Sequence, residues 1–252
     1  MTGKVALVTG AGRGIGRATA LALTGRGARV MAIARTESEL ATLAREAPVE
    51  FLTESVGTRE GCARIVAETV RRLGPIEILV NNAGIGSAHE RPIWEQDPEV
   101  WHETMAVNLH GPFELTRLVA SGMRDRRFGR IVMVSSTAGE VGAQAMSAYC
   151  ASKHGLLGLM RSVAHDLAPF NVTCNAVLPG WVRTEMAELS AEREAEARGM
   201  SVAEVWAERG SAYPAGRVVM PAEIAAAIVF LASEEASGIN GEAITVALGG
   251  LW

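Results

Sequence analysis

Tyr149 and Lys153 are the two side chains of this sequence whose types and spacing most clearly suggest catalysis. Residues four positions apart share one face of a helix, and Tyr149 stands near the start of a predicted helix over Ala148–Leu167. An ammonium group beside a phenol stabilises the phenolate, so this tyrosine could give or take a proton near neutral pH. Taken alone, such a pair is more often a surface contact, so its meaning depends on the residues that accompany it.

Three polar positions accompany that pair. Ser136 comes directly after a predicted buried strand over Arg130–Ser135, and a hydroxyl at the carboxyl end of a parallel strand faces the crevice where such sheets bind ligands. Asn81 ends another predicted strand, where it either shapes a loop or contacts a ligand. Asn108 lies in a predicted helix although asparagine is a poor helix former, which indicates a solvent-facing position or a functional kink.

A glycine-rich turn follows the first predicted strand. It reads Thr9-Gly10-Ala11-Gly12-Arg13-Gly14-Ile15-Gly16, and a predicted helix then begins. Glycine lets a backbone turn tightly and approach a phosphate, and a helix N-terminus offers free N–H groups with a partial positive charge. The spacing is TGxxxGxG and does not fit the common GxGxxG fingerprint. It nevertheless predicts a dinucleotide-phosphate site more strongly than a bare structural turn.

The end of the second predicted strand indicates which dinucleotide would bind. NAD sites usually place an acid there to hold the ribose 2′-hydroxyl, whereas this strand is followed by Arg35. A guanidinium suits a 2′-phosphate, and Arg13 in the glycine turn could join it. We therefore expect NADP(H) in preference to NAD(H), while the nearby Glu37 keeps NAD(H) possible.

The glycine turn and the polar residues at the strand ends can lie close together if their strands belong to one parallel sheet, because parallel strands end at the same edge. Short apolar runs alternate with longer amphipathic ones, which is typical of strands buried on both faces with helices between them. We expect an α/β fold, a Rossmann-type doubly wound parallel sheet of about seven strands with helices on both faces, forming one domain over residues 1–252. The predicted strands are Val5–Val8, Arg29–Ala34, Glu50–Thr53, Ile76–Val80, Arg130–Ser135, Val172–Leu178 and Glu242–Val246.

The predicted helices lie between these strands. They are Ile15–Arg26, Glu37–Glu46, Arg59–Leu73, Pro98–Asp125, Ala148–Leu167 and two segments between Glu185 and Leu231. Residues 185–210 are rich in Ala, Glu and Arg and follow a strand, so they could form a small helical lid over a substrate. A solvated pair of surface helices would have the same composition.

The overall composition narrows the classes of function. Of the 252 residues, 48% are hydrophobic and 21% charged, which suits a large buried core and excludes a disordered chain. The net charge of −4 argues against nucleic acid or an anionic membrane as partner. The cysteines and histidines lack metal-ligand or disulfide spacing, and no signal peptide or membrane span is evident. We expect a cytoplasmic protein without a metal.

Taken in order, the motifs resemble those of the short-chain dehydrogenase/reductase family over essentially the whole chain. They are TGxxxGxG at Thr9–Gly16, NNAG at Asn81–Gly84, Asn108, Ser136, YxxxK at Tyr149–Lys153, and Pro179-Gly180 with Thr184. The resemblance implies hydride transfer between NADP(H) and a ketone or secondary alcohol. An NAD-dependent 3-hydroxyacyl or secondary-alcohol dehydrogenase on the same scaffold is the alternative. A regulatory protein that only senses the cofactor would not need the serine, tyrosine and lysine together.

The resemblance also implies a role for each residue. Tyr149 would be the general acid/base, and Ser136 would hold the carbonyl oxygen. Lys153 would bind the nicotinamide ribose and lower the pKa of the tyrosine, and Asn108 would hold a water that links the lysine to solvent. Contacts with the cofactor are implied for Gly10, Gly12, Arg13, Ile15, Arg35, Ser55, Val56, Asn81, Ala83, Gly84, Tyr149, Lys153, Pro179, Gly180, Val182 and Thr184.

Two stretches depart from the family pattern. An aspartate usually meets the adenine after the third strand, but the matching stretch here reads Thr53-Glu54-Ser55-Val56, in which Ser55 could still form a hydrogen bond. Near the C-terminus the usual Val-Asp-Gly-Gly is replaced by Val246-Ala247-Leu248-Gly249-Gly250. The first change puts the adenine contact in doubt, and the second has no explanation from the sequence.

The resemblance implies a substrate pocket lined by three loops, Ile85–Trp94, Thr137–Ser147 and Trp181–Trp206. Their many apolar residues suit a hydrophobic or carrier-linked ketone. Glu140 would repel a free acid, although His89, Arg91 and Arg183 remain as possible cations. The helix over Ala148–Leu167 is apolar on more than one face, so we expect a homotetramer or a homodimer.

Overall fold

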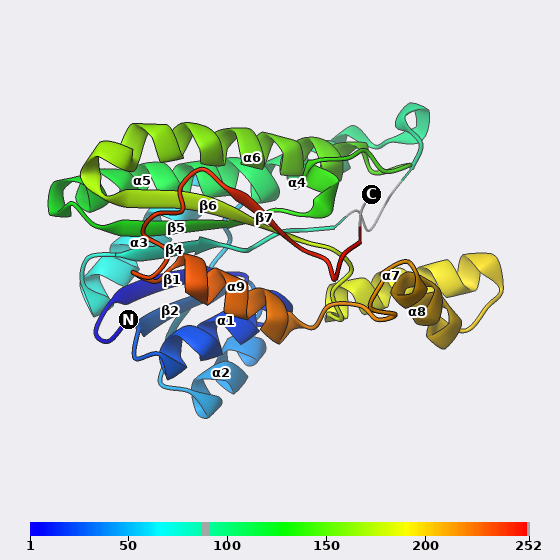
Figure 1. The fold of residues 1–252 in the computed structure, drawn as a ribbon, viewed down its shortest axis with the longest axis horizontal. Coiled ribbons are helices and arrows are strands. Elements are labelled where there is room, and N and C mark those ends of the chain that lie inside the picture. Colours follow the sequence, from blue (N-terminus) through cyan, green and yellow to red (C-terminus); the bar gives the residue numbers. More distant parts are fainter. Residues whose placement is uncertain (87–90, 251–252) are drawn as a thin grey trace.

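A seven-stranded parallel sheet forms the centre of the computed structural model, which describes residues 1–86 and 91–250 (Figure 1). The strands lie in the order β3-β2-β1-β4-β5-β6-β7. Their bounds are β1 Val5–Thr9, β2 Arg29–Ala34, β3 Glu50–Thr53, β4 Ile78–Asn81, β5 Gly129–Val134, β6 Val172–Pro179 and β7 Ala243–Val246. The predicted fold class is therefore confirmed.

Helices cover both faces of the sheet. On one face lie α1 (Gly14–Gly25), α2 (Glu37–Glu46) and α9 (Pro221–Leu231), and on the other α3 (Arg59–Leu73), α5 (Gly111–Arg126) and α6 (Ser147–Leu167). Figure 1 shows α4 (Pro98–Met105) beside α6, and α7 (Glu185–Arg198) with α8 (Val202–Ser211) as a separate projection beyond the sheet. Short turns of 3₁₀-helix occupy Ile93–Glu95, Thr137–Gly139 and Ala168–Phe170.

Burial on both faces explains why the strands read as unbroken apolar runs. In β1, Val5 and Leu7 belong to the core on the α3/α5/α6 face, whereas Ala6 and Val8 belong to the core on the α1/α2/α9 face. Successive side chains of a strand point to opposite faces, so each strand contributes to both cores. The alternation of apolar and polar residues that marks a half-exposed strand is therefore missing, as the sequence indicated.

The strand order places a crevice between β1 and β4. The chain moves outward from β1 through β2 to β3, and then returns to pair β4 with the other side of β1. In such a sheet, ligands bind outside the carboxyl ends of the strands at this switch point. The glycine turn after β1 and the Asn81–Gly84 stretch after β4 flank it.

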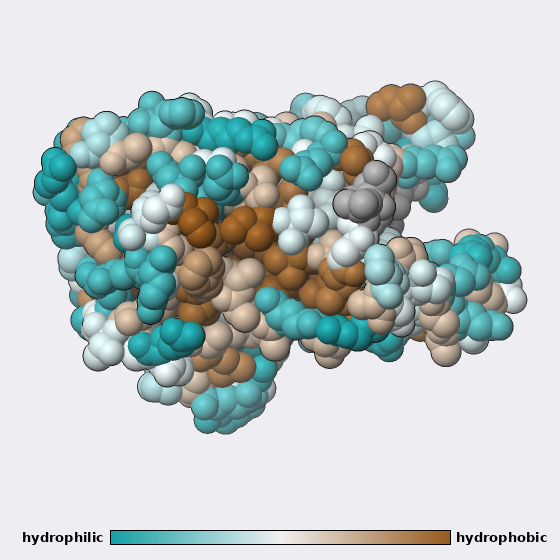
Figure 2. All heavy atoms as spheres, in the orientation of Figure 1, coloured by the Kyte–Doolittle hydropathy of each residue, from teal (hydrophilic) through white to brown (hydrophobic). Residues whose placement is uncertain are grey.

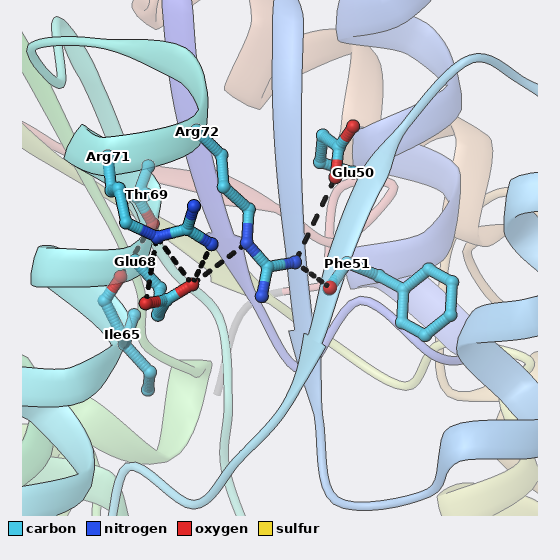
Figure 3. A network of polar contacts seen from close by, with 7 residues as sticks. All are labelled: Glu50, Phe51, Ile65, Glu68, Thr69, Arg71 and Arg72. Atoms are coloured by element: carbon cyan, nitrogen blue, oxygen red, sulfur yellow. Dashed lines mark hydrogen bonds and ion pairs between the residues drawn. The ribbon is translucent and has the colours of Figure 1, made fainter.

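An ion-pair network ties the edge strand β3 to α3 (Figure 3). Arg72 of α3 contacts Glu68 at 2.9 Å and donates to the Phe51 carbonyl of β3 at 3.2 Å. Hydrogen bonds from Arg71 and Arg72 lower the pKa of Glu68 to about 2. The pairs are exposed and contribute little each, but they fix the strand that leads to Ser55.

Most predicted elements have the observed bounds within two residues, and two predictions were wrong. The segment between Glu185 and Leu231 contains three helices, α7, α8 and α9, where two were expected, because Ser201 supplies a further N-cap after Gly199 ends α7. The predicted helix over Pro98–Asp125 is interrupted by a π-helical segment, Ala106–His110.

The surface has two projections on the side of the crevice, with a gap between them in Figure 2. One contains α7 and α8, and the other carries the loop before α4. Along 1–86 and 91–250, no helix is long and apolar enough to cross a membrane. The same described ranges hold no group of three or more His, Cys, Asp or Glu that could bind a metal.

Candidate active site

The glycine turn brings α1 against the ends of two strands. Gly10 has a left-handed φ of +65°, and a Cβ on Gly16 would lie only 2.2 Å from the Gly10 carbonyl oxygen. Side chains at these positions would push α1 away from β1, so the turn requires glycine. The N-terminus of α1 consequently points at the crevice, and Ile15 lies in its first turn.

Thr9 and Asn82 fix the relation between the β1 and β4 ends. The Thr9 hydroxyl accepts hydrogen bonds from the backbone N–H groups of Asn82 and Ala83, both at 3.0 Å. The Asn82 amide donates to the carbonyls of Thr9 at 2.8 Å and Gly10 at 3.2 Å. The sequence left open whether an asparagine after this strand shapes the loop or contacts a ligand, and Asn82 shapes the loop. Its side chain holds the glycine turn in shape, so Ala83 and Gly84 line the crevice.

The two predicted cofactor arginines lie close to each other along the backbone. A Cβ on Gly12 would lie 3.3 Å from the Ala34 Cβ. Arg13 and Arg35 are the next residues after these two, so their backbones are close together. Arg35 is exposed, and among the described residues it has no ion-pair partner. Arg13 is half-exposed and stands 3.7 Å from a carboxylate oxygen of Glu39 in α2.

Three other predicted cofactor residues use their side chains inside the protein. The Asn81 amide donates to Thr116 Oγ1 at 3.3 Å and points away from the crevice, while its Oδ1 is buried with no hydrogen-bond partner among the described residues. The Ser55 hydroxyl accepts from the Gly57 N–H, and Val56 is buried beneath α5. Contacts of these positions with a cofactor remain predictions, and they would have to involve the main chain or the Ser55 hydroxyl.

A short 3₁₀ turn brings the segments that carry Ser136 and Tyr149 together. Ser136 follows β5, and its hydroxyl accepts the Ala138 N–H at 3.1 Å, which starts the 3₁₀ turn Thr137–Gly139. This turn packs against α6, which carries Tyr149 in its first turn. Both residues are half-buried. The end of β5 and the start of α6 therefore lie at the same edge of the sheet.

Lys153 is a buried cation below this pair. Its Nζ lies 5.6 Å from the centre of the Tyr149 ring and donates to the Val134 carbonyl at 2.9 Å. Burial lowers the pKa of Lys153 to about 8, because the charged form loses its hydration. A Cβ on Gly84 would lie 3.5 Å from this Nζ, so the backbone after β4 lies directly against the ammonium.

The Ser135 hydroxyl positions the backbone of Lys153. Ser135 is buried, and its Oγ donates to the Lys153 carbonyl at 3.1 Å. Gly139 permits this contact, because its Cβ would lie 2.7 Å from Ser135 Oγ and 3.0 Å from the Lys153 oxygen. Of Ser135 and Ser136, only Ser136 was predicted to belong to the site. The position of Ser135 at the end of a buried strand could have indicated an inward-facing hydroxyl.

The π-helical segment turns Asn108 into the site. Asn108 is buried, and its Oδ1 accepts the Ile85 N–H at 2.9 Å. Its Nδ2 donates to the Ile85 carbonyl at 3.0 Å and to Ser152 Oγ at 3.1 Å, while Ser152 in turn donates to the Tyr149 carbonyl. Of the two readings of Asn108, the kink is therefore the correct one, and the solvent-facing position is excluded.

The segment after β6 closes the opposite side of the crevice. Pro179 pairs with β7, Val182 forms a bridge with Val219, and Thr184 caps α7 by accepting the Ala187 N–H. A Cβ on Gly14 would lie 3.2 Å from Thr184 Cγ2. The segment thus reaches the glycine turn, and its contact with a nicotinamide stays a prediction.

Tyr213 and the altered C-terminal stretch hold that segment in place. The Tyr213 hydroxyl accepts the Trp181 N–H at 2.6 Å, and a Cβ on Gly180 would lie 2.5 Å from the same hydroxyl oxygen. A Cβ on Gly250 would lie 2.4 Å from the Tyr213 ring. The Val246–Gly250 stretch therefore packs the tyrosine against Gly180, which gives it a structural role that the sequence did not reveal.

The α7/α8 projection is fastened to the same segment by a buried arginine. Arg209 of α8 stacks on Trp181, 3.8 Å from a ring centre, and pairs with Glu194 of α7 at 2.8 Å. Burial would raise the pKa of Glu194, but hydrogen bonds from Arg209 and Arg198 outweigh it, so this pKa lies below its usual value. The two helices and Trp181 consequently form one packed unit.

The predicted substrate loops are partly described. Met186 and Leu189 are exposed on α7, and Ile93 and Trp94 are exposed on the opposite projection. A Cβ on Gly86 would lie 3.2 Å from Met186 Sδ, so the start of α7 lies against the backbone that follows β4. Of the possible cations, Arg183 pairs with Glu188 at 3.4 Å, Arg91 is engaged in a contact, and His89 lies outside the described residues.

Comparison with known proteins yields a consistent set of relatives. Residues 4–195 match the family model described as short chain dehydrogenase. The chain is 38% identical over 243 residues to the acetoacetyl-CoA reductase of Rhizobium meliloti, covering 96% of each chain. It is 37% identical over 253 residues to a 3-oxoacyl-[acyl-carrier-protein] reductase of Vibrio cholerae, covering 98% of this chain and 96% of the relative.

Solved structures give the same result. A variant of the actinorhodin polyketide ketoreductase, solved with NADPH, superposes with a TM-score of 0.92 at 36% identity, over 98% of each chain. Levodione reductase superposes with a TM-score of 0.91 at 30% identity, over 99% of this chain and 98% of the other. Both likenesses extend over the sheet, the helices of both faces and the crevice.

Proposed function

The chain belongs to the short-chain dehydrogenase family and transfers hydride between a nicotinamide cofactor and a ketone or its alcohol, and we propose that its cofactor is NADP(H) and its proton donor Tyr149. The observation that carries the proposal is the convergence at one sheet edge of the glycine turn, the Ser136 and Tyr149 hydroxyls and the buried Lys153 ammonium. A buried lysine without a carboxylate partner among the described residues is costly in a structural core, and such groups are more common in functional sites.

The residues present fit a dinucleotide. The α1 N-terminus and the glycine turn suit its phosphates, and the exposed Arg35 with Arg13 suits a 2′-phosphate. Lys153 and Gly84 lie together where a ribose hydroxyl could be bound. Thr184 approaches the turn from the other side, so the segment from Pro179 would hold the nicotinamide. When bound, the nicotinamide supplies the hydride or accepts it.

The protein supplies the proton and holds the oxygen. In ketone reduction, Tyr149 donates its hydroxyl proton to the carbonyl oxygen while Ser136 donates a hydrogen bond to the same atom. The Lys153 ammonium stabilises the phenolate that remains. Asn108 fixes α6 through Ser152, so that the phenol stays aligned. Alcohol oxidation reverses these steps.

We take the substrate to be an uncharged or carrier-linked ketone of the 3-oxoacyl type. The relatives named above include reductases of acetoacetyl-CoA and of 3-oxoacyl groups on acyl carrier protein. The exposed Ile93 and Trp94 on one projection and Met186 on the other favour an apolar chain. Glu140, exposed in the loop after Ser136, disfavours a free carboxylate.

A screen of ketones tests the reaction. Purified protein should oxidise NADPH in the presence of at least one 3-oxoester, 3-oxoacyl thioester, aryl ketone or cyclic ketone. The assay follows the loss of NADPH absorbance, and a sample without ketone is the control. Tight binding of NADPH without turnover of any compound would overturn the reductase proposal and favour a cofactor-sensing protein.

The choice of cofactor is tested by replacing Arg35 with aspartate. Arg35→Asp removes a guanidinium from the 2′-phosphate and supplies an acceptor for a 2′-hydroxyl, so the ratio of kcat/KM for NADPH to that for NADH should fall about tenfold or more. Arg45→Asp, on the exposed far end of α2, is the matched control and should leave the ratio unchanged. A wild-type enzyme that prefers NADH would instead support the NAD-dependent dehydrogenase.

We also propose that copies of the chain assemble into a homotetramer or a homodimer. An apolar band crosses the face in Figure 2, where Figure 1 places β7 and α9. Met220 and Phe230 are 48% and 46% exposed there, and β7 is the last strand of the sheet. Such a face is typical of an interface between subunits. A monomeric mass in light scattering would contradict this proposal.

A further inference from the structure

We propose that Glu39 sets the balance between NADP(H) and NAD(H), by holding the Arg13 guanidinium in the place of a 2′-phosphate. Glu39 lies in the first turn of α2 and belongs to none of the motifs discussed above. The inference rests on the proposed function, because it concerns the cofactor site that Arg13 and Arg35 are proposed to form.

The position of the Glu39 carboxylate follows from three contacts. A Cβ on Gly12 would lie 2.4 Å from Glu39 Oε2 and 3.0 Å from the Glu39 Cβ, so this side chain lies directly on the glycine turn. The same point is 3.3 Å from the Ala34 Cβ. Arg13 Nη1 stands 3.7 Å from the other carboxylate oxygen. Glu39 therefore lies where the glycine turn meets the end of β2.

The backbone is fixed at this junction. The Ala11 N–H donates to the Ile33 carbonyl at 2.9 Å, which joins the glycine turn to β2 immediately before Ala34. The carboxylate consequently lies between the two residues proposed to hold the 2′-phosphate, Arg13 on the turn and Arg35 after the strand. A 2′-phosphate bound by both Arg13 and Arg35 would therefore lie close to the Glu39 carboxylate.

The charge of Glu39 acts in opposite directions on the two cofactors. A 2′-phosphate must displace the carboxylate from Arg13 and remain near a like charge, and both requirements weaken NADP(H) binding. A 2′-hydroxyl carries no charge and can donate a hydrogen bond to a carboxylate. Glu39 should thus weaken the binding of NADP(H) without weakening that of NAD(H).

The other interpretation is that Glu39 only stabilises α2. Acids in the first turn of a helix interact favourably with its dipole, and Glu37 is also an acid in that turn. That role would affect both cofactors equally, through the stability of the protein. The ratio of the two binding constants therefore separates the interpretations, and neither the stability nor the activity alone would do so.

The experiment measures dissociation constants by calorimetry for the wild type and for Glu39→Gln. The ligands are NADPH, NADH and the adenosine fragments that carry or lack the 2′-phosphate, adenosine 2′,5′-bisphosphate and adenosine 5′-monophosphate. Glu46→Gln is the matched control, because Glu46 lies at the far end of the same helix and pairs with Arg17. It removes the same charge from the same helix.

Glu39→Gln should bind NADPH and the bisphosphate about fivefold or more tightly, with no tighter binding of NADH or the monophosphate. Glu46→Gln should leave all four constants within twofold. An unchanged NADPH constant, or equal changes for NADPH and NADH, would overturn the role of Glu39. A wild type that binds NADH more tightly than NADPH would refute the proposed cofactor. The effect of Glu39→Gln on the ratio of the NADPH and NADH dissociation constants would still decide the role of Glu39.

Discussion

Tyr149→Phe should lower kcat for ketone reduction by about 10³-fold, because the variant lacks the hydroxyl that we propose donates the proton to the carbonyl oxygen. The substitution removes one hydroxyl from a half-buried side chain, and the ring still fills its place in α6. The dissociation constant for NADPH should therefore change by less than about threefold, since a single hydrogen bond contributes little net free energy. Stopped-flow turnover and fluorescence titration measure the two quantities.

The chain supplies a comparison for this variant, since Tyr213 is its other tyrosine. Tyr213→Phe removes the acceptor of the Trp181 N–H, which should cost about 1 kcal/mol of the free energy of unfolding. Turnover should fall less than tenfold, because this hydroxyl positions the segment after β6 and transfers no proton. A Tyr149→Phe enzyme with more than a tenth of wild-type kcat would refute the assigned mechanism.

Lys153→Met is expected to lower turnover and to raise stability at neutral pH. The variant loses the ammonium that stabilises the phenolate, so kcat should fall about 10²-fold or more. Burial holds the pKa of Lys153 at about 8, against 10.5 in the unfolded chain. A difference of this size means that burying the charged lysine costs about 3 kcal/mol at pH 7. Methionine has a similar length and no charge.

The sign of the pH dependence follows from the proton balance. Between pH 8 and 10.5 the unfolded chain binds more protons at Lys153 than the folded protein does, so the wild-type free energy of unfolding rises with pH. The free-energy cost of burying the charged Lys153 is therefore fully present below pH 8 and absent above pH 10.5. The lost hydrogen bond to Val134 offsets about 1 kcal/mol of the gain. A net stabilisation of about 2 kcal/mol should remain at pH 7 and disappear by pH 10.5.

Urea unfolding at several pH values measures this difference. Lys4→Met is the control, because Lys4 is partly exposed and pairs with Glu77 at 2.9 Å. Its removal should give no stabilisation at pH 7. A Lys153→Met protein that is less stable than the wild type at every pH would mean that the buried ammonium is compensated by its surroundings.

Much of the fold could be predicted because the relevant signals are local. Strands such as β2 and helices such as α2 and α3 have the predicted bounds, since apolar periodicity and turn residues determine both. The third helix after Glu185 was missed because the caps at Gly199 and Ser201 lie within one polar stretch of uniform composition. Composition predicts helices there but does not show where one ends.

The sequence proposes the residues of the candidate site, but it does not show which side chains support them. Tyr149, Lys153 and Ser136 carry recognisable spacing. Ser135, Asn82 and Tyr213 act through contacts with residues far along the chain, and no periodicity in the sequence reports such contacts. Lys153 illustrates the difference. The sequence indicates an ammonium beside a phenol, whereas its burial and altered pKa depend on the packing of β5 and Gly84 around it.

The π-helical segment has a less favourable backbone than a regular helix, yet it places Asn108 in the candidate site. A π turn contains one residue more than the α-helix it interrupts, and its hydrogen bonds are less favourable. Deleting one residue within Ala106–His110 would let α4 and α5 run on as a single regular helix with their apolar faces still on the core. The same deletion would remove the contacts of Asn108 with Ile85 and Ser152, so the irregular turn is the condition under which these three residues meet at the site.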